Sequence, residues 1–108
     1  MVTPSDIAEN GIKQTASTIL NKLGDKVYIS FDMDCIDPAY APGVSVPVSA
    51  GLNSTDAIYL LQKIAKRGII GMDVMEVCPS FDIKDRTSHL ASRIISEVLY
   101  SSGESHLV

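Results

Sequence analysis

The residues best suited to chemistry in this sequence are three acids that end two apolar segments. Asp32 and Asp34 follow the apolar run 27–31, and Glu76 lies at the end of a second run, 69–77. Two carboxylates this close repel each other unless a cation lies between them or they share a proton. Hard divalent ions such as Mg²⁺ and Mn²⁺ prefer carboxylate oxygens. Asp32 and Asp34 therefore form a candidate metal site.

The order of the segments explains how these acids could meet. The runs 27–31 and 69–77 read as buried strands, and a helical pattern lies between them. This order predicts an α/β fold with a parallel β-α-β unit and helices on both faces of the sheet. Ligands of such sheets bind outside the carboxyl ends of the strands. Residues two apart on a strand point to the same side, so we expect Asp32 and Asp34 to do so.

The first predicted helix has clear start and stop signals. Thr3 is suited to cap it, with Pro4 in the first turn and Asp6 as the acid that returns to the cap. Asn10-Gly11 is a turn signal that interrupts the pattern. A second amphipathic stretch follows and is expected to end at Gly24 in a left-handed conformation. The apolar stripe of this stretch comprises Ile12, Ala16, Ile19, Leu20 and Leu23.

Two further helices are predicted, one after each strand. One opens at Asn53, ends at Gly68, and carries Lys66 and Arg67 at the negative end of its dipole. The last runs over about 87–100. The residues expected to face inward are Ile58, Leu61, Ile64 and Ala65 in the first of these helices, and Leu90, Ile94, Val98 and Leu99 in the second. Two strands alone leave sheet edges without neighbours, which suggests part of a wider sheet or an assembly.

The segment 35–52 contains three prolines and two glycines, so we expect an ordered loop. A loop this long in a compact domain is usually functional. Asp37 precedes Pro38 and is assigned a structural role in starting a turn. Asp32 and Asp34 have a structural alternative as well, in which they only accept hydrogen bonds from backbone N–H groups of the loop.

Composition excludes several classes of function. The 108 residues fit one small domain or a piece of a larger one, and 45% hydrophobic with 20% charged residues is a globular composition. The net charge is -4 without a basic run, so a nucleic-acid partner is not expected. No apolar stretch reaches the roughly 18 residues of a membrane span, and the N-terminus does not resemble a signal peptide. We expect a cytoplasmic protein.

The cysteines and histidines are assigned no chemistry. Cys35 and Cys78 are expected to be reduced, buried small hydrophobes. His89 and His106 have no partner at metal-ligand spacing, and both are expected at the surface.

Two segments together resemble the ureohydrolase family of arginase, agmatinase and formiminoglutamase. "SFDMDCIDPAYAPG", residues 30–43, is similar to the family pattern S-F-D-x-D-x-x-D-P-x-x-x-P-G. "GMDVMEVCPSFD", residues 71–82, is similar to the strand with G-x-D-x-x-E-V-x-P. The chain aligns with the last third of such an enzyme, most like an agmatinase. The resemblance implies that 1–108 is the C-terminal portion of a three-layer α-β-α domain.

The resemblance also implies roles for the three acids. Asp32 would bridge two Mn²⁺ ions, Asp34 would bind one of them, and Glu76 would hold the guanidinium group of the substrate. The reaction would convert agmatine to urea and putrescine. The family's G-G-D-H and D-A-H-x-D motifs and its general acid are absent, so no catalytic residue is assigned and the chain alone is expected to be inactive. The family further implies a homo-oligomer, a trimer or hexamer.

Three alternatives remain open. The substrate could be that of an arginase or a formiminoglutamase, because Val44-Ser45-Val46 replaces the Thr-Gly-Thr of many members near the substrate. The chain could be a truncated, non-catalytic protein that acts only by association with itself or another protein. "FDMDCI" also resembles the first motif of haloacid-dehalogenase-type phosphatases, in which Asp32 would be the nucleophile and Asp34 the general acid and base.

Overall fold

Three helices and two strands alternate along the chain. In the computed structural model, which describes residues 1–104, the order is α1 (Pro4–Lys22), β1 (Tyr28–Asp32), α2 (Ser54–Lys66), β2 (Gly71–Met75) and α3 (Arg86–Glu104). Two short 3₁₀ helices, η1 (Met33–Cys35) and η2 (Pro79–Phe81), follow the strands. This order confirms the predicted sequence of elements, although neither 3₁₀ helix was foreseen.

The two strands form a parallel sheet, as predicted. Tyr28 pairs with Gly71 at one end, and Asp32 pairs with Met75 at the other. Both strands end at the same rim, so the segments that carry the acids begin side by side. The strand β2 is shorter than expected because Glu76 has a φ of 70°, which no regular strand contains.

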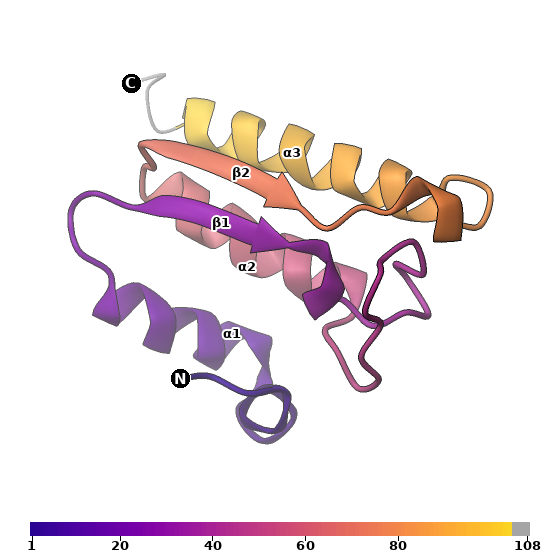
Figure 1. Cartoon of the computed structure of the whole chain (residues 1–108). Coiled ribbons are helices and arrows are strands. Elements are labelled where there is room, and N and C mark those ends of the chain that lie inside the picture. Colours follow the sequence, from indigo (N-terminus) through magenta and orange to yellow (C-terminus); the bar gives the residue numbers. More distant parts are fainter. Residues whose placement is uncertain (105–108) are drawn as a thin grey trace.

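The core lies between the sheet and two helices. Ile29 and Phe31 of β1 are buried, and Figure 1 shows α2 and α3 behind both strands. On the opposite face, Tyr28 and Ser30 are exposed. Within residues 1–104 the helices therefore cover one face of the sheet, and the prediction that they cover both is wrong for this part of the chain. The core also contains Met33, Ile36, Ala41, Val44, Ala57, Leu61, Ala65, Ala91, Ile94 and Val98.

The start of α1 follows the expected capping pattern. The Thr3 hydroxyl accepts a hydrogen bond from the Asp6 N–H at 3.2 Å, and the Asp6 carboxylate accepts one from the Thr3 N–H at 2.8 Å. Gly11, with φ 79°, kinks the helix where a turn was predicted. Of the expected apolar stripe, Ala16 is fully buried and the rest half-buried.

The end of α1 differs from the prediction. Leu23 ends the helix in an extended conformation with φ -80°, and Gly24 is not left-handed. The last carbonyl groups are instead bound from another helix, because the Arg67 guanidinium donates hydrogen bonds to the carbonyl oxygens of Leu20 and Leu23. Arg67 thus joins the ends of α1 and α2, which no local signal in the sequence indicates.

The helices α2 and α3 agree with the sequence in most respects. The Asn53 side chain accepts a hydrogen bond from the Asp56 N–H at 2.7 Å at the start of α2, and Gly68 (φ 103°) follows its end. The expected stripe of α2 is buried or half-buried, as are three of the four residues named for α3. The prediction that Leu99 faces inward is wrong, since its side chain is 68% exposed.

The loop from 36 to 52 is ordered, as predicted. Asp37 organises it: one carboxylate oxygen accepts from the Ala39 N–H at 2.9 Å and the other from the Gly51 N–H at 3.2 Å. Ile36 forms an isolated parallel bridge with Leu52 at the base of the loop. The structural role predicted for Asp37 is therefore confirmed. Among residues 1–104, no helix combines the length and the apolar character needed to cross a membrane.

Candidate functional site

Asp32 and Asp34 lie together at the rim of the sheet. Asp32 is the last residue of β1, and Asp34 lies in η1, which begins directly after it. An oxygen of the Asp32 carboxylate accepts a hydrogen bond from the Asp34 backbone N–H at 3.0 Å. The strand argument for their common direction was wrong, because the strand ends at Asp32. The tight 3₁₀ turn, anchored by the fully buried Met33, brings the two acids together instead.

The electrostatic environment of this pair is unfavourable for two bare anions. Desolvation raises the pKa of Asp34 above its ordinary value, and so do the hydrogen bond and the charge of Asp32 and the charge of Glu76. The negative charges of three acids thus lie close together at one rim of the sheet. A cation placed among them would relieve the repulsion and favour the ionised form of Asp34.

Glu76 occupies the corresponding position after β2. Its neighbour Met75 pairs with Asp32, so Glu76 begins its turn beside η1. Its side chain is exposed, and its backbone has a φ of 70°. A left-handed conformation at a residue other than glycine costs of order 1–3 kcal/mol and persists where the surroundings impose it. The structure therefore places all three predicted site residues at one rim, with Glu76 in a strained backbone conformation.

The fit of these residues to a metal ion is partial. Two carboxylates are suitable oxygen donors for Mn²⁺ or Mg²⁺. Within residues 1–104, however, no group of three or more His, Cys, Asp or Glu side chains could hold a metal ion together. Asp32 and Asp34 thus match only part of a metal-donor set.

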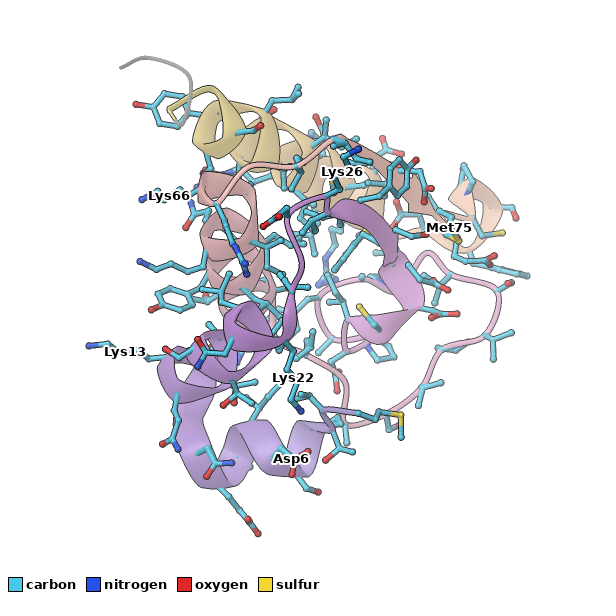
Figure 2. The ribbon with its side chains drawn as sticks, turned by 90° about the vertical axis from the view of Figure 1, so that its left-hand side faces the viewer. Asp6, Lys13, Lys22, Lys26, Lys66 and Met75 are labelled. Atoms are coloured by element: carbon cyan, nitrogen blue, oxygen red, sulfur yellow. The ribbon has the colours of Figure 1, made fainter. Side chains whose placement is uncertain are left out.

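Two lysines of α1 and α2 lie far from this rim. In Figure 2, Met75 lies on the right of the view, next to the turn that contains Glu76. Lys13 of α1 and Lys66 of α2 lie on the opposite side of the molecule. Lys13 and Lys66 therefore lie away from the turn that follows β2 (Figure 2).

The cysteines differ from the expectation of burial. Cys35 is exposed and Cys78 is half-buried, and both are free thiols. Desolvation of its sulfur raises the pKa of Cys35 to about 11, together with the charges of Asp32 and Asp34. The thiol is consequently protonated at neutral pH and is a poor nucleophile.

One of the two histidines lies within the described residues. His89 is exposed in α3, as predicted. His106 lies outside the described residues.

Three residues near the rim were missed by reasoning from sequence. The buried Gly43 donates a hydrogen bond from its N–H to the hydroxyl of the fully buried Thr87 at 2.7 Å. Asp82 binds the start of α3, where its carboxylate accepts from the N–H groups of Thr87 at 3.0 Å and Ser88 at 3.1 Å. An N-cap side chain accepts from residues two or three positions later, whereas Asp82 accepts from residues five and six positions later. Neither this contact nor the contact with Gly43 has a local sequence signal.

The Asp82 carboxylate is strongly stabilised in its ionised form. Desolvation opposes ionisation, but the hydrogen bonds from Thr87, Ser88 and Ile83 outweigh it and lower the pKa of Asp82 to about 2. Asp82 therefore remains an anion that anchors the start of α3 at all but strongly acidic pH.

The comparisons with known proteins agree with these features. A model described as "Arginase family" matches residues 1–100. An agmatinase of Neisseria meningitidis is 38% identical over 104 residues, which is 95% of this chain and 34% of the relative. A proclavaminate amidinohydrolase of Streptomyces clavuligerus is 40% identical over 107 residues, which is 98% of this chain and 34% of the relative. The chain thus spans about a third of the length of these curated relatives.

Solved structures show the same fold. The Streptomyces clavuligerus proclavaminate amidinohydrolase superimposes with a TM-score of 0.92 at 40% identity, covering 97% of this chain and 36% of that one. An arginase from Bacillus subtilis superimposes with a TM-score of 0.86 at 28% identity, covering 91% and 36%. The D-x-D at the end of β1 thus lies in an arginase fold, which overturns the phosphatase alternative. The chain belongs to the arginase family.

Proposed function

We propose that this chain supplies the acid-pair segment of a binuclear manganese ureohydrolase. The observation that carries the proposal is the placement of Asp32, Asp34 and Glu76 at one rim of a parallel sheet with an arginase fold. In this proposal Asp32 and Asp34 hold manganese, and Glu76 binds the guanidinium group of the substrate. The other metal donors come from a part of the enzyme that corresponds to the remaining two-thirds of the relatives.

In this proposal the three acids have two roles in hydrolysis, metal binding and substrate binding. Two metal ions, when bound, lower the pKa of a shared water so that hydroxide forms near neutral pH. Asp32 and Asp34 fix the position of that site. A carboxylate and a planar guanidinium form paired, charge-assisted hydrogen bonds, so Glu76 can orient the guanidinium carbon. Addition of water to this carbon and loss of the amine give urea.

Agmatine is the first candidate substrate, with putrescine as the second product. Several curated relatives are named agmatinase, and a structure named agmatine ureohydrolase from Thermoplasma volcanium superimposes with a TM-score of 0.87 at 35% identity. Arginine and other guanidino compounds are the alternatives, because relatives named proclavaminate amidinohydrolase and arginase match as well. A trimer or hexamer in the cytoplasm completes the proposal.

The direct test is manganese binding and urea release. Residues 1–108 are first titrated with Mn²⁺, and amide NMR signals near Asp32 and Asp34 should broaden. The same residues then replace the matching third of the Neisseria meningitidis agmatinase, to which they are 38% identical. The hybrid should release urea from agmatine faster than from arginine. A folded hybrid that retains manganese but releases no urea from any guanidino compound would contradict the proposal.

Association without catalysis is a second candidate, favoured by one observation. A groove of about 360 Å³ runs along the free edge of β2, between Ile69–Val74 and the outer side of α3. Ile70 and Leu99 at this groove are 69% and 68% exposed. Such an edge can pair with another strand. Concentration-dependent dimers that disappear in Ile70→Lys, together with absence of manganese binding, would favour this reading over catalysis.

A further inference from the structure

Gly43 connects the two segments that carry the candidate site. Its N–H donates to the Thr87 hydroxyl at 2.7 Å, and its carbonyl oxygen accepts from the Cys78 N–H at 2.6 Å. Gly43 belongs to the loop that follows Asp34, whereas Cys78 lies two residues after Glu76. This buried glycine, in the loop after β1, is thus hydrogen-bonded to the segment after β2 and to the first turn of α3.

The same glycine is packed against Asp82 so closely that a side chain has no room. A Cβ atom at position 43 would lie 2.7 Å from Cγ and 2.8 Å from Cβ of Asp82. Asp82 cannot easily withdraw, because its carboxylate is held by the N–H groups of Ile83, Thr87 and Ser88. We call Gly43, Asp82 and Thr87 the Gly43 clamp.

The clamp is hydrogen-bonded to the segment that directly follows Glu76, whose backbone conformation is strained. Glu76 has a φ of 70°, and the first hydrogen bond that ties its segment to the acid-pair loop is the one from Cys78 to Gly43. The loop side is rigid as well, because Asp37 binds its two ends through Ala39 and Gly51. Strained backbone persists when surrounding contacts impose it. The clamp provides such contacts two residues from Glu76.

We propose that the Gly43 clamp sets the position of Glu76 relative to Asp32 and Asp34, so that Asp82 and Thr87 are positioning residues of the site. The inference rests on the proposed function, because in that function Glu76 must hold the substrate at a fixed distance from Asp32 and Asp34. The geometry it describes is independent of that function. Neither residue touches the substrate in this proposal.

The test compares two substitutions of one buried side chain. Thr87→Val keeps the shape of the side chain but removes the hydroxyl, so the Gly43 N–H loses its acceptor. Thr87→Ser keeps the hydroxyl and removes a methyl group. Loss of one buried hydrogen bond should speed exchange of the Gly43 and Cys78 amides about tenfold in Thr87→Val. In Thr87→Ser these amides should exchange at nearly the original rate.

A readout at Glu76 separates positioning from general stability. The one-bond coupling between the Glu76 Cα and Hα atoms distinguishes a positive φ from a negative one, and in Thr87→Val it should move toward the value of a residue with negative φ. Amides of α2 should keep their protection in both variants. Unchanged Glu76 coupling and unchanged Cys78 exchange in a folded Thr87→Val protein would overturn the inference. So would equal changes in Thr87→Ser and Thr87→Val.

If Thr87→Val does not fold, hydrogen exchange of the unmutated chain still tests the clamp. The Gly43 and Cys78 amides should exchange through the same opening, with equal protection that is well above that of an unstructured peptide. Different protection at the two amides would overturn the clamp. Manganese content and urea release are then measured on the hybrid: their absence in a folded hybrid counts against the proposed function alone, because the clamp is judged by Gly43, Cys78 and Glu76.

Discussion

Asp34 and Glu76 follow different strands, yet they lie close enough for their carboxylates to interact. After desolvation and the adjacent Asp32, the charge of Glu76 is a further cause that raises the pKa of Asp34. Asp32 pairs with Met75 in the parallel register, and this pairing brings the two turns side by side. Three acids without a cation are therefore held at one rim, an arrangement that favours binding of a positive ion or group.

Replacing Asp34 by Asn should abolish manganese binding at this rim. Asn keeps the size of the side chain but loses the charge, and a site with two carboxylates has no donor to spare. We expect Mn²⁺ broadening of amide signals near Asp32 to disappear, and we expect the hybrid agmatinase to lose manganese and turnover together. Asp25→Asn, in the exposed turn before β1, removes the same charge away from the rim and is the control. Retained metal in Asp34→Asn would refute the ligand role.

Replacing Glu76 by Gly should stabilise the fold and impair substrate binding. Glycine adopts a φ of 70° without the steric cost that Glu76 bears. Relief of this strain should raise the free energy of unfolding by about 1 kcal/mol, measured by urea denaturation. Glu76→Gln is the matched control, because it keeps the strain and removes the charge. Both variants of the hybrid should show a raised KM for agmatine with manganese content unchanged.

An equal stability of the Gly and Gln variants would show that position 76 is not strained. An unaltered KM in both would instead show that Glu76 does not bind the guanidinium group. The two properties are thus tested separately on one residue.

Much of this arrangement could be predicted from local patterns. Apolar runs separated by a helical pattern indicated the parallel unit, and acids at the ends of those runs indicated the rim. The capping residues Thr3 and Asn53 were recognisable because their hydrogen bonds join residues three apart. Caps and strand ends depend on residues that are close in sequence, so they can be recognised from one sequence alone.

The failures share a different cause. Leu99 follows Val98 directly, and a helix that buries Ile94 and Val98 turns the next residue away from the core. Asp34 lies outside the strand because β1 ends at Asp32 and a 3₁₀ turn, which the sequence did not indicate, begins at Met33. Arg67, which caps the end of α2, donates hydrogen bonds to the end of α1. The last two outcomes depend on the exact end of an element and on a contact between remote segments, and periodicity does not encode either.

Replacing Gly51 by Ala should destabilise the loop that follows the acid pair. A Cβ atom there would lie 2.7 Å from the Asp37 backbone nitrogen and 2.8 Å from the Cys35 carbonyl oxygen. Backbone atoms cannot move aside as a flexible side chain can, so we expect a loss of about 1–3 kcal/mol in the free energy of unfolding. Gly24→Ala is the control, since nothing lies within 4 Å of a Cβ at that position. Similar stability of the two variants would contradict the tight packing at Gly51.

The pH dependence of stability should reveal the role of Asp82. Its pKa is about 2 in the folded chain, well below the ordinary value of 3.8 for an aspartate. A carboxyl group whose folded pKa is depressed stabilises the fold above its unfolded pKa, and this contribution is lost as the pH falls toward the folded pKa. Asp82→Asn should therefore be less stable than the unmutated chain at pH 7, and the difference should shrink between about pH 4 and pH 2. Urea denaturation of both proteins across this range measures the difference, and a difference that is independent of pH would contradict the hydrogen-bonded carboxylate at the start of α3.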